Sequence, residues 1–292
     1  MPAYSLDSEY LPLKAVLLCK PGNNAYGNED PAKVLYNKKI DFKIMEKEYS
    51  AILELYKKLK VKLYFIDSSR IKNTDCRYVF NLMFTRDLFF MTPRGAILSN
   101  MASGVRQDEI IYAERAFKNN GIRIRKIIQG DATFEGADAL WVTPGIVAIG
   151  VGNRTNDSGF KQVEGELKKD GIKCVYLPAP RSSIHLLGSL QFIDKGLALV
   201  RTGLVIPETV KLLKKSGIRL IEINECAEVK EKQALNFVTL APKKIIMPAG
   251  CPCTRKILRH YGIEVIAEVS VTQFINAGGG LACASGILSR AS

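Results

Sequence analysis

The feature that most constrains the fold is a short segment that recurs four times, each time after an amphipathic stretch ending in charged residues. Every copy opens with Gly-Ile and continues as an alternating, β-branched run; the copies start at Gly121, Gly171, Gly217 and Gly262. They lie 50, 46 and 45 residues apart, which indicates a repeat architecture. Glycine readily ends a helix and the alternating run starts a strand, so each copy predicts a helix-to-strand junction. A fifth copy, after a predicted helix over 45–59, begins at Lys60 without the glycine.

Pairs of short apolar runs, each broken by a Pro or Gly turn, precede four of the predicted helices. They cover residues 88–98, 139–149, 189–200 and 237–247. Such pairs are typical of β-hairpins, so the unit is strand–strand–helix–strand. Units of this kind arranged in a ring form a propeller around a central channel.

The first unit has one apolar run before its helix, at residues 15–19, and a segment at 276–290 is left over. We expect this closing segment to pair with the first unit and to bring Cys283 near the axis. The fold class is therefore α/β, a five-bladed propeller of ββαβ repeats with pseudo-fivefold symmetry in one domain, 1–292. The repeats are placed at residues 13–67, 77–128, 134–177, 184–223 and 235–269.

Composition narrows the class of protein. With 292 residues, 47% of them hydrophobic, the chain can bury a full core. Its start does not resemble a secretory signal, and no apolar run reaches the roughly 18 residues of a membrane span. The seven cysteines lack framework spacing, and Cys251 and Cys253 have no partner pair for zinc. We expect a cytoplasmic protein that contacts no membrane and has neither metal nor cofactor.

The net charge of +13 raises the question of nucleic-acid binding. Much of the lysine falls in the last turns of predicted helices, where cations complement the helix dipole. No basic stripe is interleaved with aromatic residues. Solvated helix faces are the favoured interpretation, and no nucleic-acid partner is predicted.

Three glycines, 278–280, lie shortly before Cys283. A Gly-rich loop running into a cysteine is compatible with a presented nucleophile. The alternative is a tightly packed closing strand with Cys283 as a buried filler. The positions just before each hairpin decide between them, because they are expected to face the axis. Together with the closing segment they carry Asp87, Glu135, His185, Asn236 and Cys283.

Five stretches carry a resemblance. They are Phe84-Thr-Arg-Asp87, Glu135-Gly-Ala-Asp138, Arg154-Thr155-Asn156, His185 and Gly278-Gly-Gly-Leu-Ala-Cys283. In this order they resemble the motif set of the guanidino-group-modifying enzymes, which include arginine deiminase, dimethylarginine dimethylaminohydrolase and the amidinotransferases. The resemblance covers roughly residues 13–290 and implies the five-bladed pentein fold.

The resemblance implies a metal-free cysteine hydrolase. Cys283 would attack the guanidinium carbon and form a covalent thiouronium adduct, its thiolate favoured by a cationic histidine or substrate. His185 would protonate the leaving amine and then activate water. Asp87 and Glu135 would hold the guanidinium as paired carboxylates. Asp138 is interpreted as structural.

Other residues would hold the rest of the substrate. The resemblance assigns the α-carboxylate to Arg154 and, less directly, to Arg106, which could instead form a surface pair with Asp108 or Glu109. It also places Phe84 and Asn236 among the substrate-binding residues. The second histidine, His260, is interpreted as a helix-end surface residue.

The chain departs from the family pattern after His185. Arginine deiminases and amidinotransferases show His-x-Asp, whereas this chain has His185-Leu-Leu187. Dimethylarginine dimethylaminohydrolases also lack that aspartate, yet Phe-Thr-Arg-Asp is the arginine deiminase form. Ser183, Ser189 or Asn236 are alternative acceptors for the guanidinium nitrogen near Leu187.

The first functional hypothesis is conversion of arginine to citrulline and ammonia, a hydrolysis of a C–N bond in a linear amidine. Hydrolysis of N-methylarginine comes second and amidino transfer third. A non-catalytic pentein that binds ribosomes or RNA is the alternative from another class. The expected partner is a small guanidino compound, and a homo-oligomer is compatible with the sequence.

Overall fold

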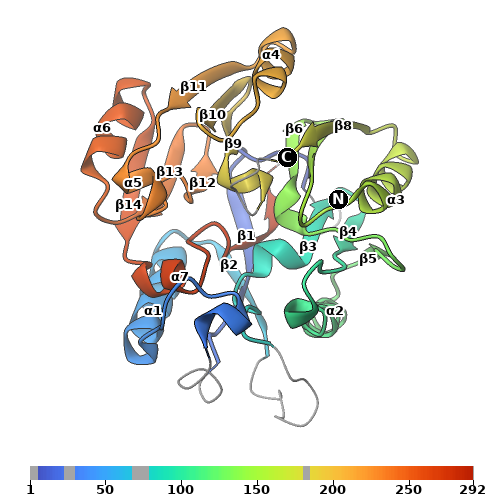
Figure 1. Ribbon diagram of the computed structural model, residues 1–292, viewed down its shortest axis with the longest axis horizontal. Coiled ribbons are helices and arrows are strands. Elements are labelled where there is room, and N and C mark those ends of the chain that lie inside the picture. Colours follow the sequence, from blue (N-terminus) through green and yellow to red (C-terminus); the bar gives the residue numbers. More distant parts are fainter. Residues whose placement is uncertain (1–5, 23–29, 68–78, 180–184, 292) are drawn as a thin grey trace.

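The computed structural model describes residues 6–22, 30–67, 79–179 and 185–291 (Figure 1). Ser183, one of the suggested acceptors, lies outside these ranges. The described part is a mixed α/β fold of five three-stranded sheets, which confirms the predicted α/β class.

The strands are β1 (Leu13–Cys19), β2 (Lys62–Ile66), β3 (Phe89–Thr92), β4 (Gly95–Leu98), β5 (Ile124–Ile127), β6 (Ala139–Thr143), β7 (Ile146–Val151), β8 (Lys173–Pro178), β9 (Leu190–Asp194), β10 (Leu197–Arg201), β11 (Arg219–Ile223), β12 (Val238–Ala241), β13 (Lys244–Pro248), β14 (Glu264–Val269) and β15 (Gly286–Arg290). The α-helices are α1 (Phe42–Lys58), α2 (Glu109–Asn119), α3 (Asp157–Lys168), α4 (Pro207–Lys215), α5 (Ala227–Lys230), α6 (Pro252–His260) and α7 (Thr272–Asn276).

Four sheets share one topology: β3-β4-β5, β6-β7-β8, β9-β10-β11 and β12-β13-β14, with the second strand in the middle. The first two strands form an antiparallel hairpin, and the third, reached through a helix, runs parallel to the second. The predicted hairpins and strand–strand–helix–strand order are confirmed in these four units.

The remaining sheet joins both ends of the described chain in the order β15-β1-β2. Strand β15 pairs antiparallel to β1, with Leu13 opposite Arg290 and Leu17 opposite Gly286. The predicted pairing of the closing segment with the first unit is therefore confirmed. Cys283, three residues before β15, is carried toward the centre by this pairing.

The helix-to-strand junctions follow the prediction from the repeat. Gly121, Gly171, Gly217 and Gly262 all adopt left-handed φ values, of 63°, 72°, 78° and 72°. Lys60, which starts the copy without a glycine, takes the same conformation with φ of 56°. A side chain in this region costs about 1–2 kcal/mol, so the repeat geometry overrides the local preference of lysine.

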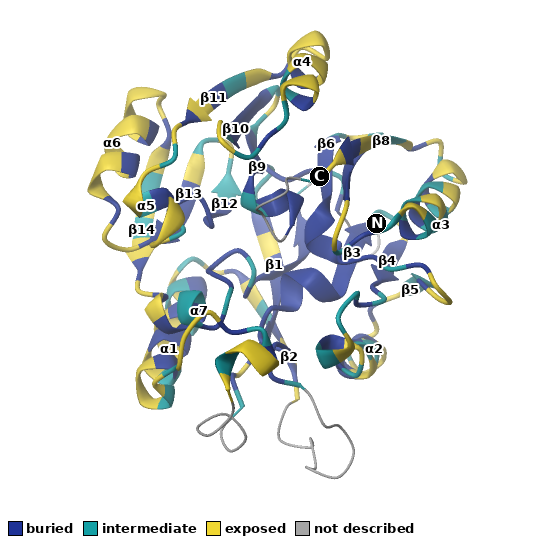
Figure 2. Cartoon of the chain, in the orientation of Figure 1, coloured by how far each residue is buried: buried dark blue, intermediate teal, exposed yellow. Residues whose placement is uncertain are grey.

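The inner strands of the five units contact one another in sequence around a common centre. Strand β12 contacts β1 and β9, β9 contacts β6, and β15 contacts β3. Trp141 of β6 stacks on Phe90 of β3 with ring centroids 5.5 Å apart. Figure 2 shows the central strands buried and the outer faces of the helices exposed.

Three short 3-10 helices precede the hairpins of the second, third and fourth units: Thr85–Leu88, Gly136–Asp138 and Leu186–Gly188. The first contacts the second, and the second contacts the third. The fold thereby brings together the predicted site positions Asp87, Glu135 and His185.

Candidate active site

One cavity of about 540 Å³ opens at the centre of the molecule. All five units contribute to its lining, with Leu35, Phe84, Arg154, His185 and Asn236 as examples. Asp87, Arg106 and Cys283 line it as well. Glu135 completes the set of predicted site residues through its contact with His185.

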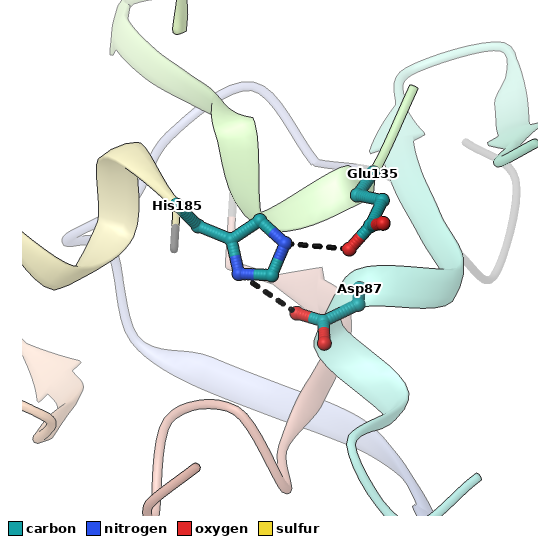
Figure 3. A group of neighbouring side chains, drawn as sticks. All are labelled: Asp87, Glu135 and His185. Carbon is teal, nitrogen blue, oxygen red and sulfur yellow. Dashed lines mark hydrogen bonds and ion pairs between the residues drawn. The ribbon is translucent and has the colours of Figure 1, made fainter. Parts of the chain in front are cut away.

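His185 lies between two carboxylates (Figure 3). Its Nε2 is 2.6 Å from Glu135 Oε2, and its Nδ1 is 3.7 Å from Asp87 Oδ1. All three side chains are buried. Burial alone lowers the pKa of His185, but Asp87 and Glu135 outweigh it and raise that pKa to about 9. Burial likewise raises the pKa of Glu135, yet His185 and the neighbouring arginines bring it down to about 2.

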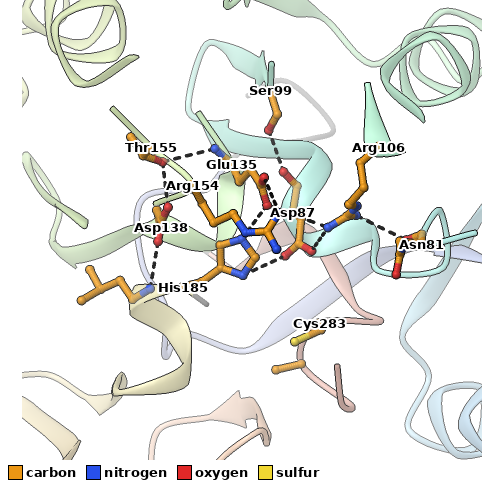
Figure 4. Close-up of polar contacts among 12 residues, drawn as sticks. Asn81, Asp87, Ser99, Arg106, Glu135, Asp138, Arg154, Thr155, His185 and Cys283 are labelled. Atoms are coloured by element: carbon orange, nitrogen blue, oxygen red, sulfur yellow. Dashed lines mark hydrogen bonds and ion pairs between the residues drawn. The ribbon is translucent and has the colours of Figure 1, made fainter. Parts of the chain in front are cut away.

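Arg106 is held by a fixed set of partners in the same cluster (Figure 4). Its Nη1 is 2.6 Å from Asp87 Oδ2, its Nε donates to Glu109 Oε2 at 2.9 Å, and its Nη2 donates to the Asn81 carbonyl. Arg106 and Glu109 are both buried. A surface pair with Asp108 or Glu109 is therefore the wrong description: the pair with Glu109 exists, but it is internal. Arg106 fixes the Asp87 carboxylate from behind.

Arg154 is the more open of the two arginines. Its Nη1 is 3.5 Å from Glu135 Oε1, and its side chain is 18% exposed, compared with 5% for Arg106. Because the side chain lines the cavity and keeps solvent contact, Arg154 has N–H groups to offer a ligand.

Asp138 anchors the turn that follows His185. One carboxylate oxygen accepts a hydrogen bond from the Thr155 hydroxyl at 2.7 Å, and the other accepts one from the Leu186 amide at 2.9 Å. These bonds orient the backbone next to His185.

Cys283 is half-buried and is tied to two other units. Its carbonyl accepts a hydrogen bond from the Arg86 amide at 3.1 Å, and its Sγ accepts one from Asn236 Nδ2 at 3.1 Å. Burial and the nearby Asp87 charge raise the pKa of the thiol to about 11, although the Asn236 bond opposes this. The expectation that a cationic histidine or substrate favours the thiolate stays a prediction.

Asn236, predicted to bind substrate, forms hydrogen bonds to the loop of residues 278–283, called here the nucleophile loop after the predicted role of Cys283. Besides donating to the sulfur, its Oδ1 accepts from the amides of Ala282 at 2.7 Å and Cys283 at 3.3 Å. The loop approaches so closely that it requires glycine. A Cβ on Gly280 would lie 2.7 Å from Asn236 Cγ, and one on Gly279 would lie 2.4 Å from the Phe84 ring.

Known proteins resemble this chain in sequence. Residues 76–210 match the family model of arginine deiminase. The uncharacterized protein YkgA of Bacillus subtilis is 26% identical over 94% of the chain and 92% of its own length. An arginine deiminase of Mycolicibacterium gilvum is 35% identical over 36% of the chain, and the aligned part spans only 28% of that deiminase.

Solved structures share the fold. A dimethylarginine dimethylaminohydrolase of Pseudomonas aeruginosa in complex with citrulline superimposes with a TM-score of 0.74 at 22% identity, covering 94% of this chain and 99% of that one. SxtG, an amidinotransferase of Microseira wollei, gives 0.78 at 17% identity, covering 99% and 98%. The chain thus resembles arginine deiminase in sequence over residues 76–210, and its fold is that of these solved structures.

Leu187 lies at the cavity wall, where it is 7% exposed. Ser189 donates its hydroxyl to the Leu186 carbonyl and is buried. Asn236 remains at the cavity but is engaged by the nucleophile loop.

Donor atoms of Asp87, Glu135 and His185 lie within 4.8 Å of one another, a grouping that is able to hold a metal ion. The two carboxylates already face Arg106 and Arg154, whose positive charges compensate them. The expectation that the protein uses no metal stays a prediction. Among the described residues, no helix has the length and apolar character needed to cross a membrane.

Two buried members of the cluster were not predicted as site residues. Glu109 pairs with Arg106, and Asn81 supplies a carbonyl to the same guanidinium. The only available signal for Glu109 was its spacing of three residues from Arg106 at the start of a helix, which equally suits an exposed pair. Asn81 carried no signal.

Proposed function

We propose that the protein is a cysteine hydrolase acting on the guanidinium carbon of arginine or an arginine derivative, most readily on arginine itself to give citrulline and ammonia. One observation carries the proposal: Cys283 lines the same cavity as Asp87 and His185, with Glu135 bonded to that histidine. The match to the arginine deiminase family model and the fold shared with the solved structures support the same chemistry.

In the first half-reaction, a planar guanidinium lies against Asp87 and Glu135, whose oxygens accept its N–H groups. The Cys283 thiolate forms a C–S bond to the guanidinium carbon. The C–N bond to the leaving amine then breaks, and His185 donates the proton that the amine requires. The product of this step is a thiouronium adduct.

In the second half-reaction, neutral His185 removes a proton from water. The resulting C–O bond replaces the C–S bond, releasing citrulline and restoring the thiolate. A pKa of about 9 suits this histidine to start as an acid at neutral pH.

The high pKa of the resting thiol gives the substrate a role in activation. Burial and Asp87 hold the pKa of Cys283 near 11. A cationic guanidinium in the cavity places a positive charge beside both groups and favours the thiolate. The nucleophile is then formed when substrate binds, and a neutral ligand gives no such help.

The α-carboxylate is assigned to Arg154, which is partly exposed and lines the cavity. Arg106 contributes less, because Asp87, Glu109 and Asn81 already take four of its N–H groups. Phe84 packs against the nucleophile loop and forms part of the wall.

Hydrolysis of N-methylated arginine is the second candidate, because apolar Leu187 lines the cavity where part of the superfamily carries aspartate. Amidino transfer to an amine acceptor is the third. A ribosome- or RNA-binding role is less favoured, because such a role has no need of a buried Asp–Glu–His cluster beside a cysteine. We also infer that the five sheets are blades of one pseudo-fivefold propeller and that the protein is cytoplasmic.

The test is a steady-state assay of citrulline, ammonia and methylamine release across arginine, N-methylarginines and agmatine. Cys283→Ser is expected to lose turnover by about 10³-fold or more, because an alcohol replaces the nucleophile, while its melting temperature and substrate binding persist. A fully active serine variant, or no product from any guanidino compound, would contradict the proposal.

A further inference from the structure

A second, small cavity of about 20 Å³ lies behind the active site. Polar lining comes from Glu9, Arg86, Gln191, Ser285 and Arg290. Arg86 directly precedes Asp87 in the same 3-10 helix, so neighbouring residues serve two different cavities.

The charges around this cavity do not balance. Glu9 accepts two hydrogen bonds from Arg86 Nη2, at 3.0 and 3.2 Å, and a third from the Trp141 amide. Its single negative charge is thus engaged by Arg86. Within the described ranges, Arg290 forms no ion pair, and its Nη1 donates only to the carbonyls of Leu11 and Thr239.

Besides the unbalanced positive charge, the two arginines have N–H groups without an acceptor among the described residues. Arg290 Nε is buried and has no hydrogen-bond partner. Toward the residues that the structure describes, the Arg86 side chain donates through Nη2 alone. Both arginines are less than a tenth exposed, at 6% and 8%. Burial lowers the pKa of Arg290 to about 10, with Glu9 opposing, so the guanidinium stays charged at neutral pH.

A buried cation without a counter-charge is costly, and an anion removes the cost more completely than neutral water. One water-sized sphere needs about 10–15 Å³ of cavity, so this space of about 20 Å³ admits a monatomic ion. Arginine N–H groups form charge-assisted bonds to anions. We propose that this cavity binds a single monovalent anion the size of chloride, held by Arg290 and Arg86.

The position of the site links it to the nucleophile. Ala282 and Ser285, on either side of Cys283 in sequence, line the small cavity, and so does Leu187 from the turn after His185. An anion there stabilises the arrangement in which the closing segment is packed behind the active site. It takes no part in the reaction.

The experiment follows the melting temperature of the full-length protein as sodium chloride replaces sodium gluconate at constant ionic strength. Above its dissociation constant, chloride is expected to raise the melting temperature by about 2 °C for each tenfold increase in concentration. Bromide should act in the same way, and crystals grown in bromide should show an anomalous peak beside Arg290.

Two variants separate this site from general salt effects. Arg290→Gln removes the surplus charge and is expected to abolish the difference between chloride and gluconate. Glu9→Gln removes the only carboxylate and is expected to shift the chloride dependence to lower concentrations, with the same limiting slope. Equal melting temperatures of the wild type in chloride and gluconate, the same halide slope in Arg290→Gln, or bromide-grown crystals without the peak would overturn the proposal. The wild-type titration decides the matter even if a variant does not fold.

Discussion

Two buried clusters of charged side chains share the 3-10 helix Thr85–Leu88, and their net charges have opposite signs. The pocket cluster has four carboxylates and three cationic side chains, so its net charge is −1 when all are ionised: Asp87, Glu109, Glu135 and Asp138 against Arg106, Arg154 and His185. The far cluster has two cations and one carboxylate, a net +1: Arg86 and Arg290 against Glu9. The sign of each net charge is opposite to that of the ligand proposed for it, a guanidinium in the first case and an anion in the second.

The surplus of the pocket cluster depends on pH. Burial raises the pKa of Glu109 to about 7 and that of Asp138 to about 6. Both carboxyl groups therefore take up protons as the pH falls below neutral, and the cluster loses its net negative charge. Affinity for a cation is expected to weaken in that range.

The largest expected contrast comes from neighbouring substitutions in the shared turn. Asp87→Asn removes a charge-assisted contact worth roughly 1.5–3 kcal/mol, so kcat/KM should fall by about 10- to 150-fold. The loss of melting temperature should be smaller than in the next variant, because Arg106 keeps Glu109 as a counter-charge. Arg86→Gln leaves the Glu9 carboxylate buried and unpaired, at about 3–5 kcal/mol, and should lower the melting temperature by about 5–8 °C. Both are measured by steady-state kinetics and thermal unfolding. A comparable loss of stability in Asp87→Asn would return Asp87 to a structural role.

Glu135→Gln tests the second carboxylate proposed to bind the guanidinium. It should also reduce kcat/KM by about 10- to 150-fold, and it should move the alkaline limb of the pH profile. In the wild type this limb is expected near pH 9, where His185 loses its proton. Without the Glu135 charge, the limb should shift toward the ordinary histidine range near 6.5. An unchanged limb would remove His185 as the acid.

The His185–Glu135 pair also predicts how stability varies with pH. The raised pKa of His185 contributes stability that is complete below about 6.5 and is lost as the pH rises through about 9. The lowered pKa of Glu135 contributes stability that is complete above about 4.5 and is lost as the pH falls toward 2. The pair therefore stabilises most between about pH 4.5 and 6.5. Glu135→Gln should flatten this dependence in denaturant titrations.

The smallest expected effect lies at Leu187, which lines both cavities. An aspartate there would give an unsubstituted guanidinium N–H an acceptor worth about 1–3 kcal/mol. Leu187→Asp should lower the ratio of kcat/KM for methylarginine over arginine by about tenfold. Leu187→Asn, of similar size and uncharged, is the control. If the aspartate variant shows no relative gain for arginine, Leu187 is only part of the wall.

The sequence was sufficient for the units because their signals are local. A glycine at the end of a helix and an alternating run after it lie within about ten residues, and Gly121 and Gly171 took the expected left-handed φ. Even Lys60 was found by its place in the repeat rather than by its own preference. The pairing of β15 with β1 followed from counting units, because one apolar run remained without a partner.

The sequence predicted which residues form the site but not how they are hydrogen-bonded to one another. Asp87, Glu135 and His185 do converge, yet the burial of Arg106 and the attachment of Asn236 to the nucleophile loop had no sequence signal. The far cluster was missed altogether, because Glu9, Arg86 and Arg290 come from widely separated parts of the chain. Such contacts are created by ring closure, which no local pattern reports.

The pairing of β15 with β1 has a consequence for the growing polypeptide. Leu13 is synthesised 277 residues before Arg290, its partner across the sheet. Until then, Cys283 has neither the β15–β1 pairing nor the Arg86 amide to hold its loop in place. Contacts so distant in sequence form slowly. The site residues Asp87, Glu135 and His185 are therefore synthesised well before the segment that fixes the position of Cys283.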